Sequence, residues 1–184
     1  GHLNNDTVIY VGTGYTNKFN GVLWKSTDIG LSWSAVQAGP DDNNSSADSL
    51  PINTIVVDPR GIDTLYIAAG NKKGNNRQAF VKSYDGGVTF QNITINNAPS
   101  GFVGLEINKN NPDSEVYVSN GRHVYYYNPS LDSVTKTVSG YPGEIINTIA
   151  YGSILVGTTT GFYNLEQDNG IVTKINSSGS SNVT

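Results

Sequence analysis

Apolar residues in this chain either alternate with polar residues or occur in short runs, and no stretch repeats them at helical spacing over three turns. Residues 52–57 and 64–69 are typical, since both are rich in β-branched and aromatic side chains. The first of these runs stops at the turn-forming pair Asp58-Pro59. The same alternation continues to residue 175. The pattern therefore predicts an all-β fold of short strands joined by turns.

One eight-residue pattern occurs twice. Residues 26–33 and 83–90 both fit S-x-D-x-G-x-[ST]-[WF]. In such a segment the aspartate can accept hydrogen bonds from backbone N–H groups of its own turn, and glycine can adopt a positive φ. The pattern predicts a tight hairpin turn whose closing aromatic residue is buried in an apolar layer. The residues expected to build the two turns are Ser26, Asp28, Gly30, Trp33, Ser83, Asp85, Gly87 and Phe90.

This pattern resembles the Asp-box, or BNR, repeat of sialidases, xyloglucanase-type glycoside hydrolases, sortilin-type receptors and photosystem assembly factors. The resemblance extends to the phrase I-V-V-D-P-x-x-x-x-T-L-Y-I-A at residues 55–68. It implies a β-propeller, in which each blade is a sheet of four antiparallel strands. In these families the box is a structural turn far from the ligand site, so the resemblance implies an architecture rather than a function.

The repeat divides the chain into four units of a single β-propeller domain, at approximately residues 6–50, 51–97, 101–140 and 143–176. The first unit lacks an apolar run for its innermost strand, and residues 128–132 replace the box in the third. Two interpretations follow. Residues 180–184 could supply the missing strand and close a four-bladed ring, or the units form part of a larger propeller. We favour the second, with self-association as one way to complete the ring.

Composition narrows the classes of partner. Charged residues make up only 14% of the chain and the net charge is −4, with no basic cluster beyond Lys72-Lys73, so nucleic acid is not an expected partner. No apolar run approaches the roughly 18 residues of a membrane span. The chain has no cysteine, which excludes disulfides and thiol catalysis. Together with six Asn-x-Ser/Thr sequons, these features favour an extracellular or cell-surface location.

Arginine and histidine offer little catalytic chemistry. A sialidase needs three arginines that clamp a carboxylate, but Arg60, Arg77 and Arg122 lie in turn or loop contexts unlike those of sialidases. His123 stands at a strand end, where a surface role explains it better than catalysis. The acidic stretch at residues 41–48 could offer oxygen ligands to Ca²⁺, but it lacks EF-hand spacing and is better explained as a solvated loop. No metal or cofactor is predicted.

Two glutamates remain as weak catalytic candidates. A glycoside hydrolase needs two carboxylates that flank a cleft. Glu106 interrupts the apolar first strand of the third unit, and Glu144 precedes the matching strand of the fourth. First strands line the central channel, where propellers usually bind ligands. An ordinary solvated or hydrogen-bonded glutamate remains the better explanation of each.

Aromatic residues supply the binding candidates, because sugar rings stack on exposed aromatic rings. The run Tyr125, Tyr126 and Tyr127 must show both faces of its strand, so we expect at least one ring to point outward. Tyr15 could lie at the mouth of the channel. Packing between blades remains the better explanation for most of these aromatic residues.

The leading hypothesis is a non-catalytic extracellular or cell-surface recognition and scaffolding module that binds glycan or protein on one loop face. The alternative is a fragment of a xyloglucanase-type glycoside hydrolase, with paired carboxylates in a channel-face cleft. An assembly factor of the photosystem type would need an arginine-rich patch, which three scattered arginines do not provide.

Overall fold

The computed structural model describes residues 7–14, 21–38, 50–70, 78–96, 102–108, 115–139, 146–150, 154–159, 161–165 and 172–175. Within these ranges the chain forms fifteen strands and no helix, which confirms the all-β prediction. A helix with the length and apolarity to cross a membrane is accordingly not found in these ranges.

The strands form four antiparallel sheets, here called blades 1 to 4, and each blade takes its strands in chain order. Blade 1 contains β1 (Ile9–Gly12), β2 (Val22–Ser26) and β3 (Ser34–Ala38). Blade 2 contains β4 (Ile52–Val57), β5 (Leu65–Gly70), β6 (Gln78–Ser83) and β7 (Gln91–Asn92). Blade 3 contains β8 (Gly104–Ile107), β9 (Val116–Ser119), β10 (His123–Asn128) and β11 (Ser133–Ser139). Blade 4 contains β12 (Ile146–Ala150), β13 (Ile154–Thr158), β14 (Phe162–Leu165) and β15 (Val172–Ile175).

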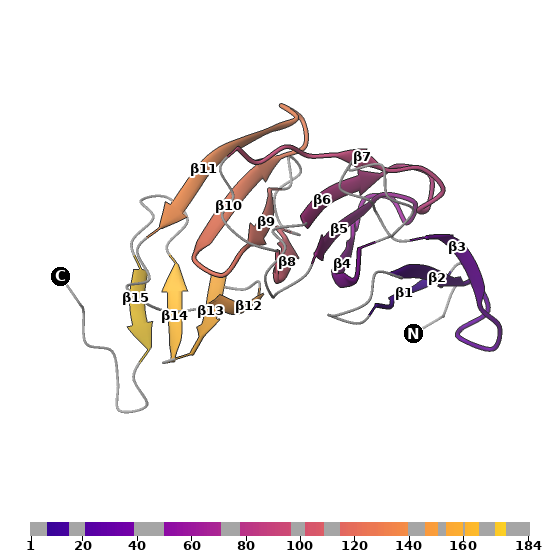
Figure 1. Ribbon diagram of the computed structural model, residues 1–184, viewed down its shortest axis with the longest axis horizontal. Helices are drawn as coiled ribbons and strands as arrows, with labels where there is room; N and C mark the ends of the chain where they lie inside the picture. The colour runs from indigo at the N-terminus through magenta and orange to yellow at the C-terminus, as the bar shows by residue number, and fades with distance from the viewer. Residues whose placement is uncertain are drawn as a thin grey trace.

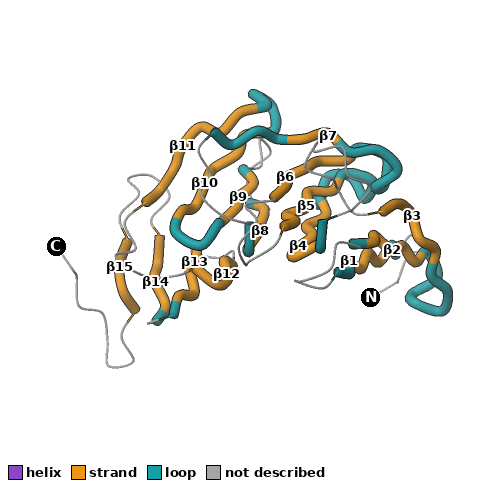
Figure 2. Tube along the Cα trace, in the orientation of Figure 1, coloured by secondary structure: helices purple, strands orange, loops and turns teal. Residues whose placement is uncertain are grey.

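The four blades fan out along an arc, with blades 1 and 4 at its two ends (Figure 1). Strands β4, β8 and β12 lie on the inner side of the arc, and β7 and β11 lie on its outer side (Figure 2). Neighbouring blades touch along their inner strands, since β1 contacts β4, β4 contacts β8, and β8 contacts β12. Blade 1 has three described strands, and this agrees with the sequence, which offers no apolar run for an innermost strand in the first unit.

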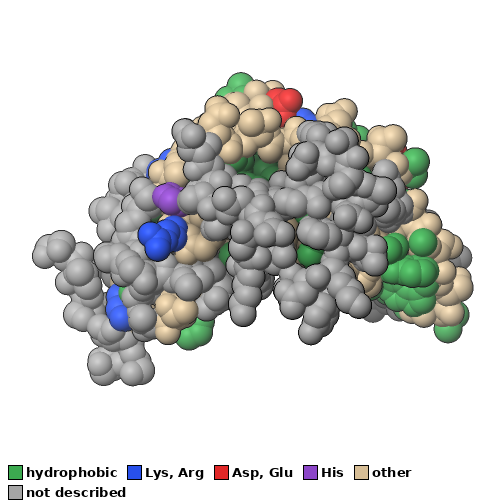
Figure 3. All heavy atoms as spheres, viewed as in Figure 1, with side chains coloured by type: hydrophobic (Ala, Val, Ile, Leu, Met, Phe, Trp, Pro, Cys, Tyr) green, Lys and Arg blue, Asp and Glu red, His purple; other side chains and the backbone are tan. Residues whose placement is uncertain are grey.

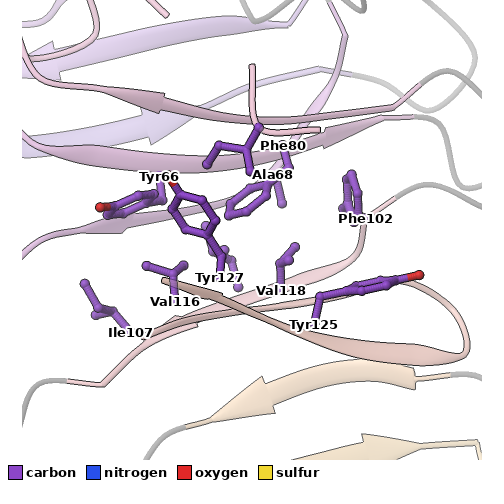
Figure 4. Packing of buried hydrophobic residues seen from close by; sticks show 11 residues of the cluster. Tyr66, Ala68, Phe80, Phe102, Ile107, Val116, Val118, Tyr125 and Tyr127 are labelled. Atoms are coloured by element: carbon purple, nitrogen blue, oxygen red, sulfur yellow. The ribbon is translucent and has the colours of Figure 1, made fainter. Parts of the chain in front are cut away.

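The hydrophobic core lies between blades rather than inside one sheet. Successive side chains of a strand point to opposite faces. Tyr66 and Phe80 therefore pack against blade 3, whereas Leu65 and Val81 pack against blade 1. Figure 4 shows the cluster between blades 2 and 3, where the Tyr127 ring meets Phe80 edge-on with ring centroids 5.6 Å apart. Edge-to-face pairs of this kind add to the area that they bury.

Both eight-residue patterns, residues 26–33 and 83–90, form turns with the same hydrogen bonds, and we call them the box turns. The Ser26 hydroxyl and the Ser32 amide each donate to Asp28 Oδ1 at 2.8 Å. Asp85 accepts equivalent bonds from the Ser83 hydroxyl and from Thr89 at 2.8 and 2.9 Å. Bonds from the hydroxyl and amide of Ser32 or Thr89 are the main cause that lowers the pKa of each aspartate to about 2.

A different turn closes the matching hairpin of blade 3. Asn128 ends β10, and its Oδ1 accepts hydrogen bonds from the amides of Ser130 and Leu131 at 2.9 and 3.1 Å. Asp132, at the end of this turn, adopts a positive φ of 48°. An aspartate tolerates this left-handed conformation better than most residues do. This turn therefore reverses the chain as the box turns do, but it presents different side chains.

The expectation that Trp33 is buried is wrong, because its side chain is 40% exposed. The matching residue of blade 2, Phe90, packs against the cluster between blades 1 and 2. The closing aromatic of a blade therefore packs toward the preceding blade. In blade 1, Trp33 donates its indole N–H to Gly30 O of its own turn at 3.1 Å.

Candidate binding site

The tyrosine run of blade 3 is buried, so the expectation of an outward ring is wrong. Tyr125 and Tyr127 lie in the cluster between blades 2 and 3, and Tyr126 lies in the cluster between blades 3 and 4. All three side chains are almost fully buried because a propeller blade is covered on both faces. These rings present no face on which a sugar could stack. Tyr15 lies outside the described residues.

The glutamate candidates are not brought together in the described part of the chain. Glu106 is half-buried on β8, and its Oε1 accepts a hydrogen bond from the Ile107 amide at 3.1 Å. Leu105 and Ile107 face blade 2, so Glu106 lies on the opposite face. Glu144 lies outside the described residues. Within the described ranges no three histidine, aspartate or glutamate side chains are placed to hold a metal ion.

A pocket of about 240 Å³ opens between blades 2 and 3. Its walls come from the β4–β5 turn, from β5, from the box turn after β6 and from the turn after β10. The turns after the first and third strands of an antiparallel blade lie at the same end, so these segments converge there. The lining residues are Asp58, Arg60, Gly61, Thr64, Tyr66, Tyr84, Pro129 and Ser130.

Two tyrosines give the pocket its aromatic character. Tyr66 is buried, and this burial raises the pKa of its hydroxyl above the ordinary value. Tyr84 is 52% exposed and occupies the position that Thr27 holds in the first box. Lys82 Nζ lies 5.5 Å from the centroid of the Tyr84 ring. The Lys82 ammonium group thus makes a cation–π contact with the Tyr84 ring, and a large part of Tyr84 remains exposed to solvent.

An ion pair forms the polar wall of the pocket. Arg60 binds Asp58 through two side-chain contacts, Nε to Oδ1 at 2.9 Å and Nη2 to Oδ2 at 2.6 Å. The Arg60 amide also donates to Asp58 Oδ1 at 2.9 Å. These bonds hold the pKa of the buried Asp58 carboxyl below its usual range, against the effect of burial. The two charges offset each other, so this wall is polar without a net charge.

Lys82 links blade 2 to blade 3 beside the pocket. It extends from β6 of blade 2, is only 6% exposed, and its ammonium donates to Asp132 Oδ1 of blade 3 at 2.7 Å. It also donates to Tyr127 Oη at 3.1 Å, and the Tyr127 hydroxyl donates to the same Asp132 oxygen at 2.6 Å. Burial alone would lower the pKa of Lys82, but the bonds to Asp132 and Tyr127 outweigh it and raise it. We call Lys82, Tyr127 and Asp132 the latch.

Sequence reasoning missed this site. One signal was present, because Lys82 interrupts the apolar run of β6 immediately before the box, where a buried charge needs a partner. Nothing in the chain order pairs it with Asp132, fifty residues later. Arg60 was recognised only as a residue that follows the Asp-Pro turn.

Comparison with known proteins shows the fold and goes no further. No protein-family model and no curated protein sequence matches the chain. Among solved structures, the extracellular domain of the putative hybrid two-component system BT4673 from B. thetaiotaomicron superposes with a TM-score of 0.61 at 14% identity, covering 96% of this chain and 22% of that one. The β-propeller domain of Cps50 (Swd1) from Myceliophteria thermophila superposes with a TM-score of 0.59 at 14% identity, covering 89% of this chain and 55% of that one. The fold is that of a β-propeller.

The chain therefore spans about a fifth of the first structure and about half of the second. As a propeller it has the blade architecture that the repeat implied, in an arc of about four blades. Identities of this size carry no information on ligands.

Proposed function

We propose that this propeller is a non-catalytic recognition module that binds glycan or protein, and that the pocket between blades 2 and 3 is its binding site. The observation that carries the proposal is the exposed Tyr84 ring beside the polar side chains of Arg60 and Ser130. An aromatic surface with a few convergent polar groups is the usual composition of a ligand pocket.

The chemistry of the pocket favours a neutral saccharide ring. The apolar C–H face of a sugar can stack on the Tyr84 ring, and its hydroxyl groups can bond to the ion-paired side chains of Asp58 and Arg60 and to Ser130. An acidic sugar would need a cation not already paired. Arg60 is bound to Asp58 and Lys82 to Asp132, so the pocket does not provide one.

Rigid walls support a recognition role. The Arg60–Asp58 pair orders one wall and the latch joins blade 2 to blade 3, so little side-chain motion has to be lost when a ligand binds. Such preorganisation raises affinity by lowering the entropic cost of association.

An extracellular or cell-surface location is part of this proposal. It is supported by the low charged fraction of the chain and by Asn92, which is exposed on β7 within an Asn-x-Thr sequon. The fold serves as an extracellular domain in the B. thetaiotaomicron protein. Glycosylation at Asn92 after secretion from eukaryotic cells, detected by mass spectrometry, would show that this site is accessible to the export machinery.

The test is a binding screen with matched variants. Neutral oligosaccharides are screened by saturation-transfer NMR, and the best ligand is titrated by calorimetry. Tyr84→Thr places the residue of the first box in the second, so the turn should form as before while the stacking surface is lost. Val88→Ala changes an exposed residue of the same turn that does not line the pocket.

We expect Tyr84→Thr to weaken binding about tenfold or more, as for a central aromatic contact, and Val88→Ala to leave it unchanged. No binding by any saccharide would refute the saccharide assignment. Equal affinities of Tyr84→Thr and the unmodified chain would refute the site.

A further inference from the structure

Two of the side chains that line the pocket between blades 2 and 3 are almost fully buried, Asp58 and Tyr66. Asp58 already binds Arg60 through both of its carboxylate oxygens. The Tyr66 ring packs in the cluster between blades 2 and 3, with its centroid 6.2 Å from that of Tyr127. In Figure 4 the Tyr66 hydroxyl points away from the other residues of this cluster. Since Tyr66 also lines the pocket, its hydroxyl is the part of the side chain that faces the pocket.

The Tyr66 hydroxyl has no hydrogen-bond partner among the described residues. Burial raises the pKa of this hydroxyl most, and nearby Tyr84 and Asp58 raise it further, so the hydroxyl lies among the groups that line the pocket. A neutral phenol can donate one hydrogen bond and can also accept one. A buried group with this capacity normally has a partner in the protein, in ordered water or in a ligand.

The same position has a partner inside the protein in the neighbouring blades. Tyr10 of β1 and Tyr117 of β9 occupy the position of Tyr66 in their own blades, as the ladder registers show. The Tyr10 hydroxyl donates to Ile62 O at 3.3 Å. The Tyr117 hydroxyl donates to Glu115 Oε2 at 3.0 Å. In blade 2 no described group takes this role, so the repeat leaves one buried polar position open at the pocket.

The wall that the β4–β5 turn forms is already bonded within itself. The Asp58 amide donates to Thr64 O at 2.8 Å, and the Thr64 amide donates to Gly61 O at 2.9 Å. The charge of Arg60 is offset by its ion pair with Asp58. On the face that Figure 3 shows, the charged side chains of the described residues are few and scattered. The group that a ligand places against Tyr66 is therefore expected to be neutral.

We propose that the Tyr66 hydroxyl determines which saccharide the pocket accepts, and that it selects an N-acetylated amino sugar by donating a hydrogen bond to the acetamido carbonyl. This inference rests on the proposed function. A phenol donates more readily than it accepts, because the lone pair of its oxygen is delocalised into the ring. The amide carbonyl is the strongest neutral acceptor among the common substituents of sugars. The methyl group beside it can pack on the apolar surface of Tyr84 and Pro129, which also line the pocket.

A buried hydrogen-bonding group discriminates strongly between ligands. A sugar without the acetamido group would cover the Tyr66 hydroxyl and leave it unbonded, and this penalty adds to the hydrogen bond that the sugar fails to gain. We expect the affinity for an N-acetylated saccharide to be at least about tenfold higher than for its unsubstituted counterpart.

The test compares two neutral trisaccharides, triacetylchitotriose and cellotriose, by calorimetry. They share one backbone linkage and differ in the acetamido group that each ring of the first carries. Tyr66→Phe keeps the ring in its cluster and removes only the hydroxyl, so it should weaken the binding of triacetylchitotriose about tenfold and leave that of cellotriose unchanged. Tyr125→Phe removes the same atom from a buried tyrosine of the same cluster that does not line the pocket, so neither affinity should change.

A second measurement needs no ligand. The Tyr125 hydroxyl accepts a hydrogen bond from Asn120 Nδ2 at 3.0 Å, so Tyr125→Phe should lower Tm by about 2–4 °C, the shift expected for one ordinary hydrogen bond in a domain of this size. The Tyr66 hydroxyl makes no such bond, so Tyr66→Phe should leave Tm unchanged or raise it slightly. Equal losses in the two variants would show that the Tyr66 hydroxyl is already bonded in the free protein, and would overturn the proposal.

The binding results also separate this inference from the proposed function. Equal affinities of the unmodified chain for the two trisaccharides, or a Tyr66→Phe variant that keeps the preference, would overturn the inference and leave the recognition site in place. Loss of both ligands in a folded Tyr66→Phe variant would assign the residue to the shape of the pocket and would also overturn the inference. Failure of every saccharide to bind would refute the saccharide assignment and this inference together.

Discussion

Replacing Asp132 by glycine removes the acceptor that holds the Lys82 ammonium group between blades 2 and 3. Glycine suits the positive φ of this position, so the backbone should be unaffected. Lys82 would stay 6% exposed with Tyr127 as its remaining hydrogen-bond partner. Removing one partner of a buried ion pair costs about 3–5 kcal/mol when the other charge is left uncompensated. Because Tyr127 remains, we expect about 3 kcal/mol.

Removing the other partner should cost much less. Lys82→Met keeps the length and apolar stem of the side chain and leaves Asp132, which is 68% exposed and keeps its hydrogen bond from Tyr127. No charge is then buried without a partner, so we expect a loss of about 1 kcal/mol or less. The double variant should resemble Lys82→Met, because glycine at position 132 is harmful only while the ammonium group is present.

Urea unfolding and thermal melting at pH 7 measure these differences. For a domain of this size about 1 kcal/mol shifts Tm by roughly 2–4 °C, so Asp132→Gly should melt about 6–12 °C lower and Lys82→Met about 4 °C lower at most. Equal losses for the two single variants, or a double variant less stable than Asp132→Gly, would refute the assignment of Lys82 as a buried charge that depends on Asp132.

Two further predictions concern the box turns. Asp28 and Asp85 have a pKa of about 2 in the folded chain against 3.8 as the ordinary value, so their stabilisation is present above about pH 4 and is lost as the pH falls toward 2. Tm measured by circular dichroism should therefore be nearly flat from pH 5 to 7 and should decline below about pH 4. A decline that Asp85→Asn leaves unaltered would contradict this prediction. Gly87→Ala should lower Tm more than Gly30→Ala, because both need a positive φ but only at Gly87 would the added methyl collide with Leu23. Equal effects in the two turns would show that strain alone decides.

The parts of the fold that depend on local chemistry were predictable from the sequence. Alternating apolar residues define strands wherever they occur, and serine, aspartate and glycine at the box positions determine the turn by bonds within eight residues. The replacement of the third box at residues 128–132 was also visible in the sequence, because it removes those residues.

Burial and the candidate site depend on which blade lies beside which. Tyr126 is buried because blade 4 covers a face that a single strand would leave open, whereas Trp33 is exposed because the blade it would pack on is not among the described residues. The pocket unites segments around positions 58, 84 and 129, and the latch joins residues fifty positions apart. Such pairings arise from the packing of repeats, about which strand periodicity carries no information.

The altered turn of blade 3 also breaks the equivalence of the repeats. A chain of similar units would present similar grooves, and a ligand would then meet several weak sites. Here Pro129 and Ser130 line the groove between blades 2 and 3 and Asp132 binds Lys82 across it, so this groove differs from the one between blades 1 and 2, where the following blade carries a box turn. Loss of the consensus in one unit thus makes neighbouring grooves of a repetitive fold unequal. Under the proposed function, we expect one ligand to bind each copy of the chain.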